Sequence, residues 1–167
     1  RPSRSAASSI WIIRAPAVAR ATGAGPIRVR LRLASPRLPS MQPDAEVRLP
    51  ADSAYVAVLR MTTAGIAARL DFTLDDIEDL RMAVGEASAM LLERTRPGGQ
   101  LITQYFLGES RVAVRISVDA VQPTPPETNS FAWQVLTTTA SDVSAETGED
   151  VLTICLTVTS TTSSAPA

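Results

Sequence analysis

The chain has 167 residues, enough for one folded domain, and its hydrophobic content of 45% is sufficient for a core. Aromatic residues make up only 4%, so we expect that core to consist of Ala, Val, Leu and Ile. The absence of histidine excludes every triad, metal site and phosphotransfer mechanism that needs this residue. The single cysteine, Cys155, excludes an internal disulfide and a multi-cysteine metal site, and favours the reducing cytoplasm.

Charge is divided unevenly along the chain. Residues 1–40 contain eight arginines and no acid, whereas residues 41–167 contain eight arginines and all 17 acidic residues, for a net charge of −9. Because binding to phosphate groups needs clustered positive charge, the acidic part is not expected to bind nucleic acid.

The first 40 residues show no sustained hydrophobic period, and we expect them to be a disordered basic arm or an upstream non-native segment. Their one apolar run, at 10–13, is too short to span a membrane. Two other interpretations remain for this arm: an element that binds nucleic acid or anionic lipid, or an Arg-rich targeting peptide. The folded domain is expected over residues 41–160, followed by a disordered tail over 161–167.

The elements predicted next are a short edge strand at 46–49, ended by Pro50, and a helix from Asp52 or Ser53 to about Leu70. A second helix is predicted over 74–94, with Thr73 and Asp76 spaced as in a capping box. Its inward face carries apolar residues at helical spacing, namely Ile77, Leu80, Val84, Ala87 and Leu91. The acids between Asp71 and Asp79 are interpreted as helix-start residues, not as ligands of a metal ion.

Alternating residues predict two strands at 100–107 and 111–118, joined as a hairpin. A proline-rich loop, a helix from 130 to about 143 and a last strand at 151–159 follow. This grouping predicts an α+β two-layer sandwich, with helices on one face of a mostly antiparallel sheet.

Within the second helix, Glu86 and Met90 are four residues apart and therefore lie side by side, on a face different from the apolar one.

The segment VRLPADSAYVAVLRMTTAGIAARLDFTLDDIEDLRMAVGEASAMLL, residues 47–92, resembles the anti-sigma-factor serine kinases of the RsbW type. These kinases belong to the histidine-kinase-like (GHKL) ATPases. The piece FAWQVLTTTASDV, residues 131–143, looks like the helix before the final strand in actinobacterial members of this family.

The resemblance implies a role for several positions. Glu86 falls on the family's catalytic acid, which helps to activate the attacking hydroxyl, and Arg60 falls on an arginine that contacts the protein partner. Met90 replaces the asparagine that ligates Mg²⁺, and Asp119 stands where an aspartate would read the adenine of ATP. The glycine-rich segments that hold the nucleotide are missing, because no glycine occurs between Gly108 and Gly148. The implied nucleotide site, formed by Glu86, Met90 and Asp119, is therefore degenerate.

Two functions remain open at this point. The first is a cytoplasmic anti-sigma-like regulator, of the stress-response kind, that binds a sigma factor or an anti-anti-sigma (STAS-type) protein and handles ATP and Mg²⁺ poorly. The second is an active ATP-dependent serine kinase that phosphorylates an anti-anti-sigma factor. The resemblance also implies a homodimer, and nothing in the sequence predicts a membrane partner.

Overall fold

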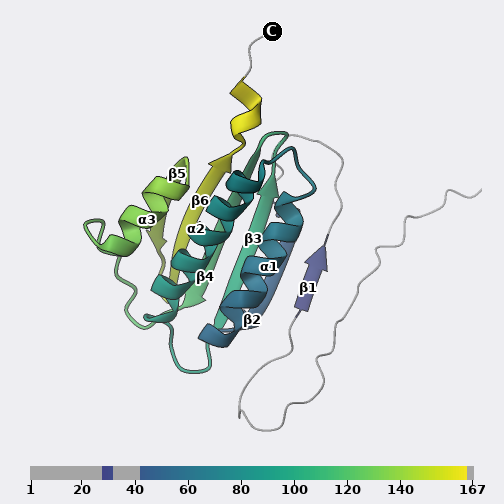
Figure 1. The fold of residues 1–167 in the computed structure, drawn as a ribbon. Helices are drawn as coiled ribbons and strands as arrows, with labels where there is room; N and C mark the ends of the chain where they lie inside the picture. Colours follow the sequence, from purple (N-terminus) through teal and green to yellow (C-terminus); the bar gives the residue numbers. More distant parts are fainter. Residues whose placement is uncertain (1–27, 32–41, 165–167) are drawn as a thin grey trace, which may run out of the picture.

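The computed structural model describes residues 28–31 and 42–164, which form two layers: one antiparallel sheet with three α-helices on one of its faces (Figure 1). The sheet has six strands in the order β1-β2-β3-β4-β6-β5. The predicted α+β two-layer sandwich is therefore confirmed. The strands are β1 (Arg28–Leu31), β2 (Ala45–Pro50), β3 (Gln100–Leu107), β4 (Arg111–Asp119), β5 (Asp142–Thr147) and β6 (Val151–Thr159). The helices are α1 (Val56–Ala67), α2 (Leu74–Leu92) and α3 (Phe131–Thr139), with short 3-10 helices η1 (Ser53–Tyr55) and η2 (Thr161–Ser164).

The beginning of α2 has the predicted capping box. The Thr73 hydroxyl accepts a hydrogen bond from the Asp76 amide at 3.1 Å, and the Asp76 carboxylate accepts one from the Thr73 amide at 2.9 Å. Two of the amides that a helix start leaves unpaired are thereby satisfied. The predicted inward face is also confirmed, because Leu80, Val84, Ala87 and Leu91 are fully buried.

The core lies between the helices and the inner face of the sheet. Alternate residues of β3 and β4 are buried, as the sequence alternation predicts, and they are paired in register, for example Thr103 with Ile116 and Tyr105 with Val114. Helix α2 lies over the middle of the sheet between α1 and α3 (Figure 1). This central helix carries Glu86 and Met90.

The chain between α3 and β6 differs from the prediction. The predicted helix to Val143 is wrong in its last part, because α3 ends at Thr139 and β5 begins at Asp142. Side-chain hydroxyls of Thr137 and Thr138 both donate to the Gln134 carbonyl, and three consecutive β-branched residues are poor helix formers. The strand that follows is held by pairing with β6, which local sequence does not reveal.

Most of the predicted basic arm lies outside the described residues. Four of its members, Arg28–Leu31, form β1 and pair antiparallel with β2. The predicted edge position of the strand at 46–49 is therefore wrong, because β2 has β1 on one side and β3 on the other.

The beginning of the expected C-terminal tail is bonded to the domain. Ser160 is buried and its hydroxyl donates to the Asp71 carbonyl at 2.6 Å, while the Thr161 amide donates to the Asp76 carboxylate at 3.3 Å. Residues 165–167 lie outside the described part of the chain.

Across residues 28–31 and 42–164, no helix combines the length and the apolar character that crossing a bilayer requires.

Candidate functional site

A cleft of about 230 Å³ lies between the second half of α2 and the segment that leads into α3. The α2 wall consists of residues one helical turn apart on one side of the helix, and the opposite wall comes from the loop 126–130 and the first turn of α3. The lining residues are Glu86, Ala89, Met90, Glu93, Arg94, Pro126, Glu127, Ser130 and Ala132. The fold therefore creates a cleft at the position that the sequence singled out.

Glu86 and Met90 lie together on the α2 wall of this cleft, as their spacing predicted. Both side chains are half-buried, and Met90 also packs against the hydrophobic core. Glu86 could accept a proton from a bound hydroxyl group, but a thioether is a soft ligand and does not serve Mg²⁺, which needs oxygen atoms.

The cleft is negatively charged. Three carboxylates line it, those of Glu86, Glu93 and Glu127, and none has a hydrogen bond or an ion pair with another described residue. The one cation among the lining residues is Arg94, whose Nη1 donates to the Thr124 carbonyl at 3.1 Å and to its hydroxyl at 2.6 Å. Repulsion between like charges therefore makes this cleft unfavourable for a triphosphate.

The start of α3 closes the cleft on the other side. The Ser130 hydroxyl accepts a hydrogen bond from the Trp133 amide at 3.2 Å, so this helix start is capped by its own side chain. In the preceding loop, Gln122 has a φ of 51°, in the left-handed region that usually favours glycine. At the start of α3 the Trp133 amide is therefore already used by the cap and is not available to an anion.

The residues that sequence reasoning missed are Glu93, Arg94 and Glu127. Glu93 and Arg94 continue the helical spacing of Glu86 and Met90 by one turn, so this signal was present in the sequence. Glu127 comes from the proline-rich loop, and only the fold brings it to α2.

Asp119 is not among the residues that line this cleft. It lies at the end of β4, where its carboxylate accepts a hydrogen bond from the Gln100 amide at 3.2 Å. The structure thus brings together Glu86 and Met90, but it places the Asp119 carboxylate on the backbone at the start of β3.

Arg60 is an exposed residue of α1 and is not among the residues that line the cleft. Val58 and Met61, which are close to Arg60 in the sequence but lie on other faces of α1, are exposed hydrophobic residues with 41% and 70% of their surface accessible. The surface of α1 thus carries both a cation and exposed apolar side chains, which are residue types found at protein-contact surfaces.

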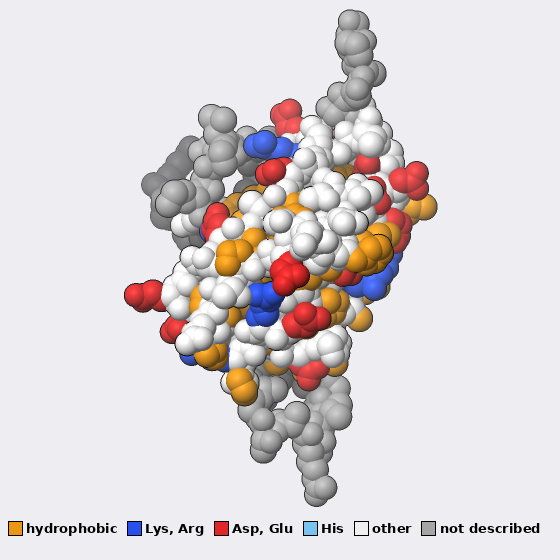
Figure 2. Space-filling view, turned by 90° about the vertical axis from the view of Figure 1, so that its left-hand side faces the viewer, with side chains coloured by type: hydrophobic (Ala, Val, Ile, Leu, Met, Phe, Trp, Pro, Cys, Tyr) orange, Lys and Arg blue, Asp and Glu red, His pale blue; other side chains and the backbone are white. Residues whose placement is uncertain are grey.

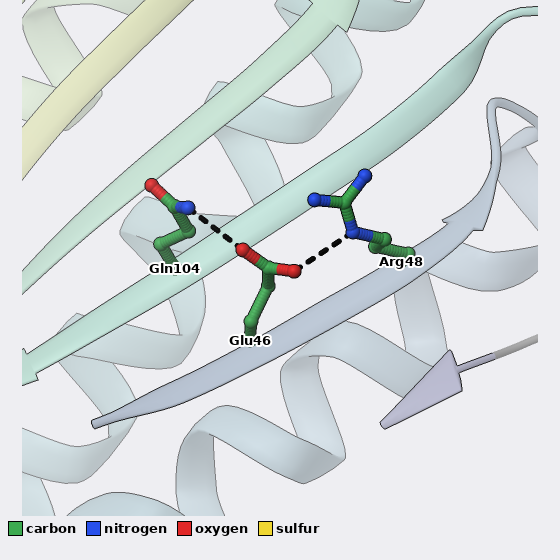
Figure 3. Close-up of polar contacts among 3 residues, drawn as sticks. All are labelled: Glu46, Arg48 and Gln104. Carbon is green, nitrogen blue, oxygen red and sulfur yellow. Dashed lines mark hydrogen bonds and ion pairs between the residues drawn. The ribbon is translucent and has the colours of Figure 1, made fainter. Parts of the chain in front are cut away.

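Other surfaces have ordinary polar character. Acidic side chains with hydrophobic ones between them are spread over the side of the molecule that carries α3 and β5 (Figure 2). On the sheet face opposite the helices, the Glu46 carboxylate accepts hydrogen bonds from Arg48 Nε and Gln104 Nε2, each at 2.7 Å (Figure 3). We interpret this cluster as a cross-strand contact that fixes register. Within residues 28–31 and 42–164, no group of three or more acidic or cysteine side chains is placed to hold a metal ion.

An antiparallel sheet covered on one face by helices, with a cleft beside the second helix, is consistent with a GHKL-like fold. No protein-family model matches the chain. Over 78 residues, however, it is 33% identical to proteins named serine-protein kinase RsbW from Bacillus thuringiensis (strain Al Hakam), Bacillus cereus (strain AH820) and Bacillus anthracis. The match covers 46% of this chain and 49% of each relative, so the chain spans about half the length of the curated relatives it matches. These findings support an RsbW-like family for the chain.

Proposed function

We propose that this protein is a cytoplasmic, anti-sigma-factor-like regulator that binds a sigma factor, an anti-anti-sigma (STAS-type) protein, or both, and whose nucleotide site is degenerate. Similarity to the RsbW relatives supports the class of protein, and the residues that line the cleft support the loss of nucleotide chemistry.

The observation that carries the proposal is the composition of the cleft wall. Met90 occupies the place where the family resemblance implies a Mg²⁺ ligand, and three unpaired carboxylates line the same cleft. Phosphoryl transfer depends on metal ions that bridge the phosphates and on positive groups that stabilise the developing charge. The residues present do not fit a magnesium nucleotide, so we derive no phosphotransfer step.

The partner-binding role is assigned to the outer surface of α1, with Arg60 as its central cation. Arginine is enriched at interaction hot spots, and a docking surface does not require ATP chemistry. A protein can therefore lose its nucleotide site and retain capture of its partner.

Two observations favour a second function, an ATP-dependent serine kinase that acts on an anti-anti-sigma factor. The relatives are named serine-protein kinases, and Glu86, the counterpart of their catalytic acid by resemblance, does line the cleft.

A titration with ATP, with and without Mg²⁺, followed by a phosphotransfer assay on a candidate STAS-type protein, decides between these functions. We expect no Mg²⁺-dependent binding and no phosphate transfer. Magnesium-dependent transfer that disappears in Glu86→Gln would overturn the degenerate-site proposal and establish the kinase. We expect Met90→Asn alone not to create tight ATP binding, because the carboxylates of Glu93 and Glu127 remain.

Partner capture is tested separately with two variants. Arg60→Ala should weaken binding of a sigma factor or STAS-type protein by about 2 kcal/mol, the size of a hot-spot effect. Glu86→Gln, the matched control, should leave capture unchanged, because Glu86 lies on the cleft wall and not on α1. Equal effects of the two substitutions would contradict the assignment of the α1 surface.

A further inference from the structure

The side chain of Arg60 crosses from α1 to α2 and lies over Gly85. A Cβ atom added to Gly85 would be 3.2 Å from Arg60 Cδ and 3.6 Å from both Cγ and Nε. Because these three consecutive atoms surround one point, the aliphatic stem of Arg60 rests on the bare backbone of the glycine. Any other residue at position 85 would have to share this space with the stem.

Nothing else in the described residues holds the Arg60 side chain through a polar contact. Its guanidinium has no ion pair or hydrogen bond with a described residue, and the residue is exposed. A free arginine side chain samples many rotamers, and fixing it on binding has an entropic cost. Contact of the stem with Gly85 reduces that freedom before a partner arrives.

We propose that Gly85 is a positioning residue for Arg60: it provides a seat on α2 that directs the guanidinium outward from the helix pair. This inference rests on the proposed function, in which Arg60 contacts a protein partner. The seat immediately precedes Glu86, so one turn of α2 carries both the support of the partner-contact arginine and a wall of the cleft.

Gly65 on α1 offers a matched control for this contact. It is also a helical glycine, but a Cβ atom there would meet nothing within 4 Å. Replacing glycine by alanine inside a helix raises the folding equilibrium constant about fivefold through helix propensity alone. We expect this full gain for Gly65→Ala.

The test is a double-mutant cycle of Gly85→Ala and Arg60→Ala, measured by urea unfolding of the full chain. In the wild-type background Gly85→Ala should raise the folding equilibrium constant by about twofold or less, because the new methyl group displaces the Arg60 stem. In the Arg60→Ala background the gain should rise to that of Gly65→Ala. Equal gains from Gly85→Ala in both backgrounds would overturn the proposal.

A spectroscopic measurement reports the orientation of Arg60 without any partner. The Nε–Hε signal of Arg60 is identified by NMR through its loss in Arg60→Ala. It should shift in Gly85→Ala and remain in place in Gly65→Ala; an unchanged signal in Gly85→Ala would also overturn the proposal. Because neither measurement uses a partner, a failure of the seat is distinguishable from a failure of Arg60→Ala to weaken capture, which concerns the proposed function.

Discussion

Asp76 connects the start of α2 to the segment that follows β6. Its carboxylate accepts hydrogen bonds from the Thr73 amide at 2.9 Å and from the Thr161 amide and hydroxyl at 3.3 Å each, and the residue is only 4% exposed. Burial raises the pKa of Asp76, but the hydrogen bonds from Thr73 and Thr161 outweigh this effect and lower it below 3.8. A carboxyl group whose pKa is lower in the folded state than in the unfolded state stabilises the fold at any pH above its unfolded-state pKa. This stabilisation is lost as the pH falls through the folded-state pKa.

We therefore predict that Asp76→Asn destabilises the protein by about 2 kcal/mol near pH 7, because an amide cannot accept all of these hydrogen bonds. The difference from wild type should narrow as the pH falls below about 4, the ordinary pKa of an aspartate. Unfolding midpoints in urea between pH 2 and 7 measure both effects. Asp75→Asn, in the same turn but exposed, is the control and should change stability by less than about 0.5 kcal/mol. A difference between wild type and Asp76→Asn that stays constant to pH 2 would contradict the argument.

Tyr105 forms a buried polar pair with Thr63. The two hydroxyl oxygens are 2.8 Å apart, and because the Thr63 hydroxyl donates to the Leu59 carbonyl, the Tyr105 hydroxyl must donate to Thr63. Burial raises the pKa of Tyr105 to about 12, because the phenolate would lose its solvation in the core. The ordinary pKa of a tyrosine is 10.0, so above this pH the unfolded chain ionises Tyr105 while the fold keeps it neutral. The protein therefore loses stability as the pH rises above 10.

We predict that Tyr105→Phe costs about 1 kcal/mol at pH 7, the net contribution of one hydrogen bond. The substitution should also reduce the loss of stability above pH 10. Chemical unfolding at pH 7 and pH 11 tests both statements, and absorbance titration of wild type against Tyr105→Phe reports the phenol directly. A phenol that titrated near pH 10 in the folded protein would contradict the burial of the Tyr105 hydroxyl against Thr63.

At the scale of the site, helical spacing alone was sufficient to place Glu86 and Met90 on one side of α2. The same spacing would have added Glu93 and Arg94 if it had been extended by one turn. Glu127 was beyond reach, because a loop residue 41 positions after Glu86 comes to α2 only through the path of the chain after β4. The contact of Arg60 with Gly85 was equally hidden, since it depends on how α1 and α2 cross.

Among the elements, those with strong local signals were predictable and those held by pairing were not. The capping residues of α2 and the alternation of β3 and β4 specify their structures locally. Strand β5 has the sequence DVSAET, which includes residues disfavoured in strands, and it exists because Val143 and Ala145 pack on the core beside β6. Long-range pairing also decides that β1 forms next to β2.

For the third helix, we predict that Ser130→Ala costs about 1 kcal/mol through loss of the N-cap. Ser130→Asn should retain most of the stability, because Asn is also a good capping residue. Thermal or urea unfolding of the two variants provides the measurement. Equal losses in both variants would show that Ser130 acts through its contacts in the cleft and not as a cap.

At the scale of the whole molecule, the sheet has two outer strands, β1 and β5. Strand β1 has only four residues, and β2 behind it has six. An uncovered strand presents unpaired amides and carbonyls, which can pair with a second chain. Strand β1, paired on β2 with Arg30 opposite Glu46, therefore covers the edge of β2, which would otherwise be available for self-association.

The last prediction concerns this edge and compares two fragments, residues 28–167 and residues 42–167. Both should fold, and their unfolding free energies should differ by no more than about 1 kcal/mol, because a four-residue outer strand adds little to a domain whose core lies elsewhere. Removal of β1 should nevertheless expose β2, so the shorter fragment should dimerise more strongly through antiparallel pairing of β2 with its copy. Sedimentation at tens of micromolar measures this difference, and a charge substitution at an exposed position of the opposite outer strand, Ser144→Lys in β5, serves as the control that should not alter it. If both fragments were monomeric, or if the longer one dimerised more strongly, the β2 edge would not direct assembly, and a homodimer would have to use another surface.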